Sequence, residues 1–272
     1  MPYFADIEKT LLWYTTVLRI GGKKINTFLS LKAEFDHAFL WGEHEKCLDL
    51  LSQCHLQYGW SMWEIRNRIA VLNEFKGIDG QKQYTKKVLS EMQEGSVLYY
   101  LIYSFSKQCE RNISFHTYQN IIQHDYNRFL SGQTPMNLCK YIRYKANGYM
   151  FGSKENFDFK DRDLVNFFLV MDDKGSLIDR YLSFCDIAAN ALALNAECCK
   201  YFIPCLSMLS AEIADPFLKN TTHLWQKHYY RFRPEGSDRI CRALDFYAVG
   251  QYEKSRSIAQ ELLQESIIFS LW

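Results

Sequence analysis

The sequence predicts an all-α protein, and three observations support this prediction. Apolar residues recur at three- and four-residue spacing along nearly the whole chain, whereas sustained alternation of apolar and polar residues is hard to find. The 272 residues include only five Pro and 13 Gly, which is few for a protein built of many β-hairpins. Hydrophobic residues make up 48% of the chain and aromatic residues 16%, so we expect a buried core in which rings pack together.

The N-terminal part divides into short helices because glycines recur between its apolar runs. The first helix is expected to end at Gly21 and Gly22, and glycines at 42, 59, 77, 80 and 95 separate the segments that follow. Thr134 before Pro135 is a typical helix start, because a capping side chain precedes a proline at the first helical position. After the first helix, this part is predicted to contain helices at 25–41, 43–58, 60–75, 81–92, 97–109, 115–130 and 135–144.

The segment 147–163 is the one clear interruption of the helical pattern. It carries two glycines and many charges, and no helical period is visible in it. We therefore expect an N-terminal helical-repeat half at 1–146, a loop or linker at 147–163, and a C-terminal helical half at 164–272. Helices in the second half are predicted at 164–171, 177–194, 196–209, 216–230, 239–249 and 252–269.

Two stretches, FLWGEHEKCLDLLSQC at 39–54 and FYAVGQYEKSRSIAQELL at 246–263, have the same helix–turn–helix pattern. An antiparallel helix pair with a glycine turn cannot bury both of its faces alone, so such pairs stack on neighbouring copies. The pattern resembles the tetratricopeptide-repeat family, whose small, aromatic and glycine positions are matched in part by both stretches. The matching residues are Ala38, Gly42 and Cys47, with His44 in place of the usual Tyr, and Ala243, Phe246, Gly250, Tyr252 and Ser255.

This resemblance covers only part of the chain. Leu262 and Cys54 stand where the family usually has a small Ala, neither stretch has the closing Pro, and no clear copy lies between Gly95 and Arg239. The predicted fold is therefore a set of antiparallel helical hairpins, stacked either in a solenoid like that of the family or in an irregular helical array.

The resemblance implies a scaffold or regulatory module that binds a partner segment on a concave helical surface. In the family, the first helix of each pair lines this surface. The corresponding positions are Lys32, Asp36 and Phe39 in the first stretch and Leu244 and Tyr247 in the last.

A second predicted contact region is KHYYRFRPEGSDRICR, at 227–242. Arg231 and Arg233 alternate there with aromatic rings, and this combination suits an acidic peptide or stacked bases. The alternative is that the arginine stems simply cover rings at a helix end.

The motif RNISFH provides an alternative function. It resembles the R-x4-H motif of HEPN-type ribonucleases, which implies that Arg111 and His116 would act on a scissile phosphate without a metal ion. About one such match is expected by chance in this composition, however. Ser114 also has the position of a helix cap, which would leave Arg111 before the helix.

No metal ion or cofactor is predicted. His44, Cys47, Cys54 and His55 would all come from one helix, whereas tetrahedral zinc sites usually require ligands from a second chain direction. Asp172 and Asp173 precede a glycine and are expected in a turn. The segment CKYIRYK at 139–145 is expected to be a solvated helix face.

The remaining features concern location and assembly. The nine Cys form no C-x-x-C pair and the N-terminus does not have the pattern of a signal peptide, which predicts reduced thiols and a cytoplasmic location. A net charge of +1 provides no general attraction to nucleic acid or membranes.

The apolar C-terminal tail predicts a contact with a second subunit or a partner. The alternatives are that it folds back on its own core or that the chain is a fragment. The residues concerned are Ile267, Ile268, Phe269, Leu271 and Trp272.

Overall fold

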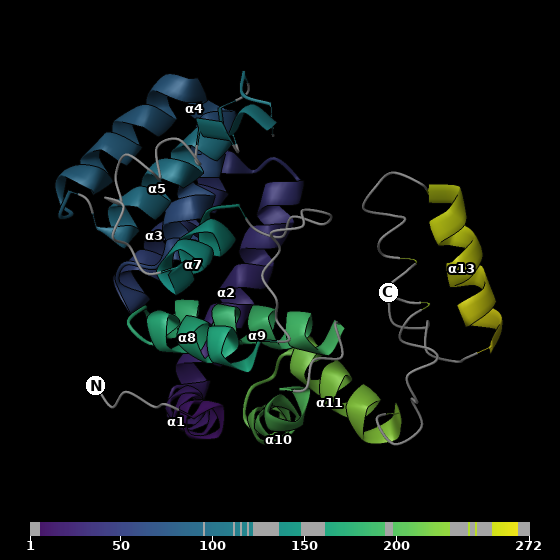
Figure 1. The fold of residues 1–272 in the computed structure, drawn as a ribbon. Helices are drawn as coiled ribbons and strands as arrows, with labels where there is room; N and C mark the ends of the chain where they lie inside the picture. Colours follow the sequence, from purple (N-terminus) through teal and green to yellow (C-terminus); the bar gives the residue numbers. More distant parts are fainter. Residues whose placement is uncertain are drawn as a thin grey trace. The chain divides into compact units, whose positions relative to one another are not determined.

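The computed structural model describes residues 6–94, 96–110, 112–114, 116–118, 120–121, 136–147, 161–193, 198–228, 239, 243 and 252–265. Throughout these ranges the regular secondary structure is helical and no β-strand is present, which confirms the predicted all-α class (Figure 1). The helices are α1 Ile7–Ile20, α2 Gly22–Leu40, α3 His44–Tyr58, α4 Met62–Ser90, α5 Val97–Gln108, α7 Met136–Asn147, α8 Arg162–Asp172, α9 Leu177–Ala193, α10 Cys199–Ser210, α11 Pro216–His228 and α13 Tyr252–Glu265.

Helix packing divides the chain into two compact units. One unit, here the α2–α5 unit, comprises the described residues of Thr16–Gly148 and Phe167–Ser183. The other comprises those of Met1–Thr15, Tyr149–Asn166 and Phe184–Trp272. The predicted linker at 147–163 lies mostly outside the described residues, so its role as a boundary stays a prediction.

Of the predicted glycine separators, Gly42, Gly59 and Gly77 interrupt the helices of the α2–α5 unit, whereas Gly80 lies within a helix and Gly95 lies outside the described residues. Gly42 and Gly59 follow α2 and α3 with φ of 70° and 73°, a backbone conformation that residues with a Cβ rarely adopt. Gly77, at φ 69° and ψ −171°, produces a kink within α4, so the helices predicted at 60–75 and 81–92 are two arms of one bent element. Gly21 separates α1 from α2, and a Cβ there would lie 2.6 Å from a methyl carbon of Leu177.

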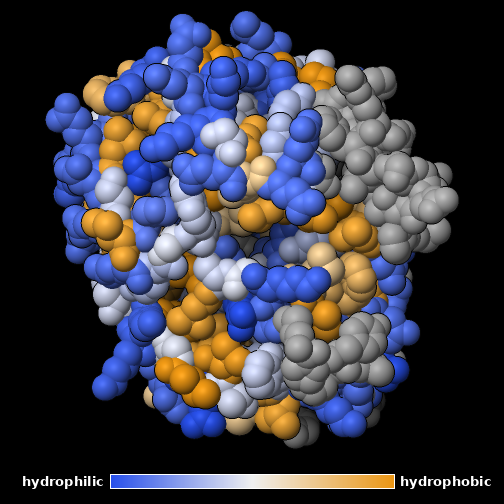
Figure 2. Space-filling view, turned by 90° about the vertical axis from the view of Figure 1, so that its left-hand side faces the viewer, coloured by the Kyte–Doolittle hydropathy of each residue, from blue (hydrophilic) through white to orange (hydrophobic). Residues whose placement is uncertain are grey.

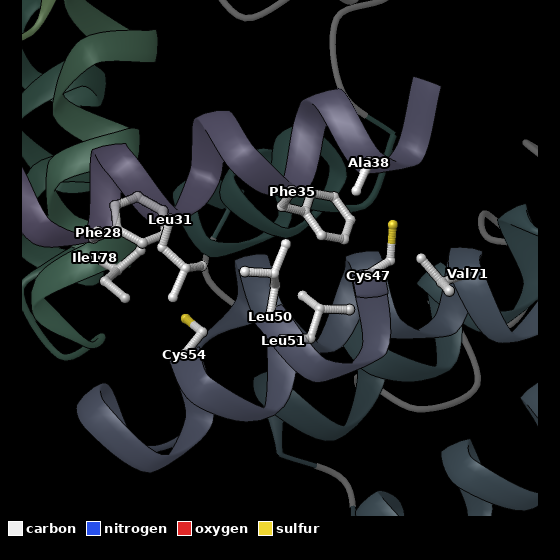
Figure 3. Packing of buried hydrophobic residues seen from close by; sticks show 10 residues of the cluster. All are labelled: Phe28, Leu31, Phe35, Ala38, Cys47, Leu50, Leu51, Cys54, Val71 and Ile178. Atoms are coloured by element: carbon white, nitrogen blue, oxygen red, sulfur yellow. The ribbon is translucent and has the colours of Figure 1, made fainter. Parts of the chain in front are cut away.

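The core of this unit forms where one stripe of α2 meets α3 and α4. Residues at three- and four-residue spacing on α2 point toward α3, with Ala38 near Cys47 and Phe35 near the leucines of α3 (Figure 3). Phe28 contacts Trp63 edge-on, with ring centroids 5.0 Å apart. The cluster comprises Phe28, Leu31, Phe35, Ala38, Cys47, Leu50, Leu51, Cys54, Val71 and Ile178.

Asp179 connects the start of α9 to the start of α4. Its carboxylate accepts hydrogen bonds from the backbone N–H groups of Met62 at 2.9 Å and Trp63 at 3.2 Å, and from the Ser176 hydroxyl at 2.9 Å. Burial raises the pKa of Asp179, although these hydrogen bonds oppose the rise. The acceptors satisfy backbone donors at the start of α4 that no helical carbonyl can reach.

The prediction of a solvated helix face at 139–145 is wrong, because the aromatic side of α7 is buried. Tyr141 and Tyr144 are 7% and 3% exposed, and both rings lie against Phe168. The Tyr141 hydroxyl donates to Asp172 Oδ1 at 2.7 Å, and Lys145 Nζ lies 3.0 Å from Asp172 Oδ2. Asp172, at the end of α8, thus pairs with Tyr141 and Lys145, and this pairing allows the basic, aromatic face of α7 to be buried.

The second unit is also helical. Within it, α10 packs against α11, and Phe184 of α9 contacts Phe202 with ring centroids 5.7 Å apart. Cys198, Cys199 and Cys205 are buried, as are Cys47 and Cys54 in the other unit, so these five cysteines act as small core residues. No described helix is long and apolar enough to cross a membrane.

Truncation of single rings should show a difference in unfolding free energy between the buried stripe of α2 and its exposed side. We expect Phe28→Ala, at a fully buried position, to lower the free energy of unfolding by about 3–5 kcal/mol, because it leaves a cavity beside Trp63. Phe39→Ala, on the same helix but 41% exposed, should cost about 1 kcal/mol or less. Chemical denaturation measures both, and equal losses would contradict the assigned packing.

Candidate partner-binding surface

The three α2 residues predicted to line a binding surface lie along one side of the helix. Lys32, Asp36 and Phe39 are spaced so that each follows the last by about one helical turn. Lys32 Nζ lies 2.5 Å from Asp36 Oδ2, and the two side chains are 33% and 49% exposed. The Phe39 ring stacks on Phe35 with centroids 5.9 Å apart, so one face of the ring is supported by the core and the other is open.

Large apolar side chains are exposed at the adjoining end of the α2–α3 hairpin. Leu40 and Trp41 are 84% and 72% exposed, although they directly follow the buried stripe of α2. Phe75 and Ile78, on either side of the kink in α4, are each 43% exposed. Together with Phe39 these residues make up what we call the hairpin-end surface.

Two ring contacts hold this surface in place. His44, the first residue of α3, stacks on Phe75 with centroids 5.4 Å apart and planes 10° apart, which places the end of the first arm of α4 beside the α2–α3 turn. Trp41 Nε1 donates a hydrogen bond to His37 Nε2 at 3.1 Å, so the indole is oriented although it is exposed. Three side chains of the hairpin-end surface, those of Phe39, Trp41 and Phe75, are therefore held by neighbouring rings.

The exposed apolar residues elsewhere are a useful comparison. Figure 2 shows one face of the molecule, on which apolar patches lie between hydrophilic residues. Single exposed apolar residues are ordinary in proteins. The distinguishing feature of the hairpin-end surface is that five large side chains, each at least 41% exposed, belong to neighbouring helix ends.

The other predicted contact residues lie outside the described part of the chain. These are Leu244 and Tyr247 of the last stretch, Arg231 and Arg233 of the basic-aromatic segment, and the five tail residues at 267–269, 271 and 272. From the same regions, Ala243 is buried at a position where the family has a small residue, and Arg239 Nη2 pairs with Glu261 Oε2 at 2.7 Å.

The RNISFH motif is described only in part. Ser114 is a helix cap as predicted, because its Oγ accepts a hydrogen bond from the Thr117 backbone N–H at 3.1 Å. His116 lies in the first turn of this helix and is exposed, and its Nε2 is 3.2 Å from Asn120 Nδ2. Arg111 lies outside the described residues, so the ribonuclease alternative stays a prediction.

The four His and Cys residues of α3 have separate surroundings. Cys47 and Cys54 point into the core, whereas the His44 and His55 rings lie against Phe75 and Trp60. Burial raises the pKa of the Cys54 thiol to about 12 and also raises that of Cys47, which disfavours the thiolate that a metal ion requires. No group of three or more metal-binding side chains occurs among the described residues.

The comparisons with known proteins found no matching family model, curated protein or solved structure.

Thiol labelling should distinguish the buried cysteines from the accessible ones. At pH 8 we expect iodoacetamide to modify the partly exposed Cys139 well before Cys47 and Cys54, whose raised pKa and burial both suppress reaction. Peptide mass spectrometry of native protein measures the order, and denatured protein, in which all sites should react, is the control. Labelling of native Cys54 as fast as Cys139 would contradict this account.

Proposed function

We propose that this protein is a binding module that holds a segment of a partner protein on the hairpin-end surface and the adjoining side of α2. The observation that carries the proposal is the group of five exposed apolar side chains, Phe39, Leu40, Trp41, Phe75 and Ile78, at one end of a well-packed core.

Burial of these side chains by a partner would provide most of the binding free energy. Complete burial of a large apolar side chain contributes about 1.5–3 kcal/mol relative to leaving it in water. Trp is among the residues that most often dominate protein interfaces, and Trp41 is both 72% exposed and already oriented by His37. Because the indole is held before binding, less side-chain entropy is lost on association.

The Lys32–Asp36 pair would contribute to specificity. Exposed ion pairs are worth about 0–1 kcal/mol, so either charge can exchange its neighbour for a group on the partner at little cost. The partner segment is accordingly expected to carry apolar side chains flanked by a charged residue. It would lie along α2 as an extended or helical stretch.

The wider architecture would be an array of helical hairpins in which α2 and α3 form the first pair. In favour of this array, the pairs with extensive packing include α2 with α3, α3 with α4, and α4 with α5, which are consecutive along the chain. Ala38 and Cys47, at small-residue positions of the resemblance, are buried against each other's helices as close packing of a hairpin requires.

A matched pair of leucines tests the proposal. Leu40 and Leu56 are both 84% exposed, but Leu40 belongs to the hairpin-end surface whereas Leu56 lies near the other end of α3. A partner is first recovered by quantitative affinity capture with the wild-type chain and then titrated against purified variants. We expect Leu40→Ala and Trp41→Ala to weaken binding, the latter by about tenfold or more, and Leu56→Ala to leave it unchanged.

Two results would overturn this assignment. One is a partner that binds Trp41→Ala and Phe39→Ala as tightly as wild type. The other is a loss of binding affinity with Leu56→Ala equal to that with Leu40→Ala. Reversal of both charges, Lys32→Glu with Asp36→Lys, preserves the pair within the helix. It should therefore weaken binding only if the partner contacts these charges directly.

A further inference from the structure

A pocket lies between the second arm of α4 and α5, on residues that the hairpin-end surface does not include. Its volume is about 540 Å³, within the range typical of small-molecule sites. α4 contributes Lys82, Thr85, Lys86, Leu89 and Ser90, α5 contributes Tyr99, Tyr103 and Ser106, and the connection between them contributes Met92 and Glu94.

The two helices provide the pocket with two different walls. Lys82 and Lys86 are four residues apart on α4, and Tyr99 and Tyr103 are four residues apart on α5, so each pair lies on one face of its helix. The pocket is therefore cationic on one side and aromatic on the other, with Leu89 and Met92 adding apolar surface.

Of the two lysines, Lys86 is the one available for a ligand. Lys82 Nζ pairs with Glu110 Oε1, and Lys107 Nζ lies 3.2 Å from the same oxygen. Burial alone would raise the pKa of Glu110, but its hydrogen bonds to Lys82 and Lys107 and their charges lower it, so this carboxylate stays ionised and neutralises Lys82. Lys86 is exposed and forms no ion pair with any described residue.

Ser106 lines the pocket on the α5 side, although it is only 3% exposed. Its Oγ is 2.6 Å from Gln81 Nε2, which donates to it, and its carbonyl oxygen accepts a second bond from the same nitrogen at 2.9 Å. Because Oγ is the acceptor in this bond, the Ser106 hydroxyl keeps its own proton for donation to another acceptor. The fully buried Gln81 thus fixes the position of the Ser106 side chain.

We propose that this pocket binds a small molecule that carries an aromatic ring and one anionic group, a phosphate monoester or a carboxylate. The ring would lie against Tyr99 and Tyr103, and the anion would meet the Lys86 ammonium and the Ser106 hydroxyl. Glu94, a carboxylate at the same pocket, disfavours ligands that carry a second anionic group.

Phenyl phosphate and benzoate are suitable probes for the intact 272-residue chain. Isothermal titration calorimetry or ligand-observed NMR at about 0.15 M salt should show saturable binding of at least one, with a dissociation constant of about 1 mM or below. Inorganic phosphate and phenol, which each lack one half of the ligand, should bind at least about tenfold more weakly.

Adjacent lysines provide the matched control. We expect Lys86→Gln to weaken binding about tenfold and Lys87→Gln, at an exposed position that does not line the pocket, to leave it unchanged. Tyr99→Leu should also weaken binding, whereas Trp41→Ala should not, which separates this site from the proposed partner surface. No saturable binding of either probe, or equal loss with the two lysine variants, would overturn the proposal.

Discussion

The α2–α5 unit depends on the removal of one apolar stripe of α2 from water. Phe28, Leu31, Phe35 and Ala38 follow one another at three- and four-residue spacing, and α3 returns antiparallel to cover them because Gly42 allows the chain to reverse immediately after α2. The hairpin cannot bury its other side alone, so α4 packs on α3 and brings Val71 and the ring of Trp63 to the same core.

The same constraint explains why the candidate surface lies where it does. A helix of 3.6 residues per turn can direct only one side toward α3, so apolar residues off that stripe must face another element or water. Phe39, Leu40 and Trp41 lie at the end of α2, where the stripe gives way to the turn. The His44 ring extends the exposed region to Phe75 because antiparallel packing places the end of the first arm of α4 next to the start of α3.

Charged groups provide further contacts between helices, and two of these helices, α7 and α8, contribute no residue to the core cluster of α2. Asp172 from α8 holds Tyr141 and Lys145 of α7, and Asp179 from α9 accepts the first backbone N–H groups of α4. Each carboxylate is at least partly shielded from water, and an unpaired charge in such surroundings would be costly. The arrangement is therefore favourable only when the carboxylate and its hydrogen-bond or ion-pair partner are both present. These contacts connect residues that are 27 to 117 positions apart, from Lys145 and Asp172 at the short end to Met62 and Asp179 at the long end.

The sequence alone determined the helical class, the turns at Gly42 and Gly59, and the capping role of Ser114. Each of these follows from residues within a few turns of one another, because helical periodicity, backbone freedom and capping are local properties. It also identified Phe39 as an accessible position, but not Leu40 or Trp41, since apolar character does not reveal which neighbour covers a side chain. Only the tertiary structure decided that Tyr141 and Tyr144 are buried, and that Lys86 lines the same pocket as Tyr99 and Tyr103. Those outcomes depend on which distant helix packs against a given face, and the local pattern of polar and apolar residues does not identify that helix.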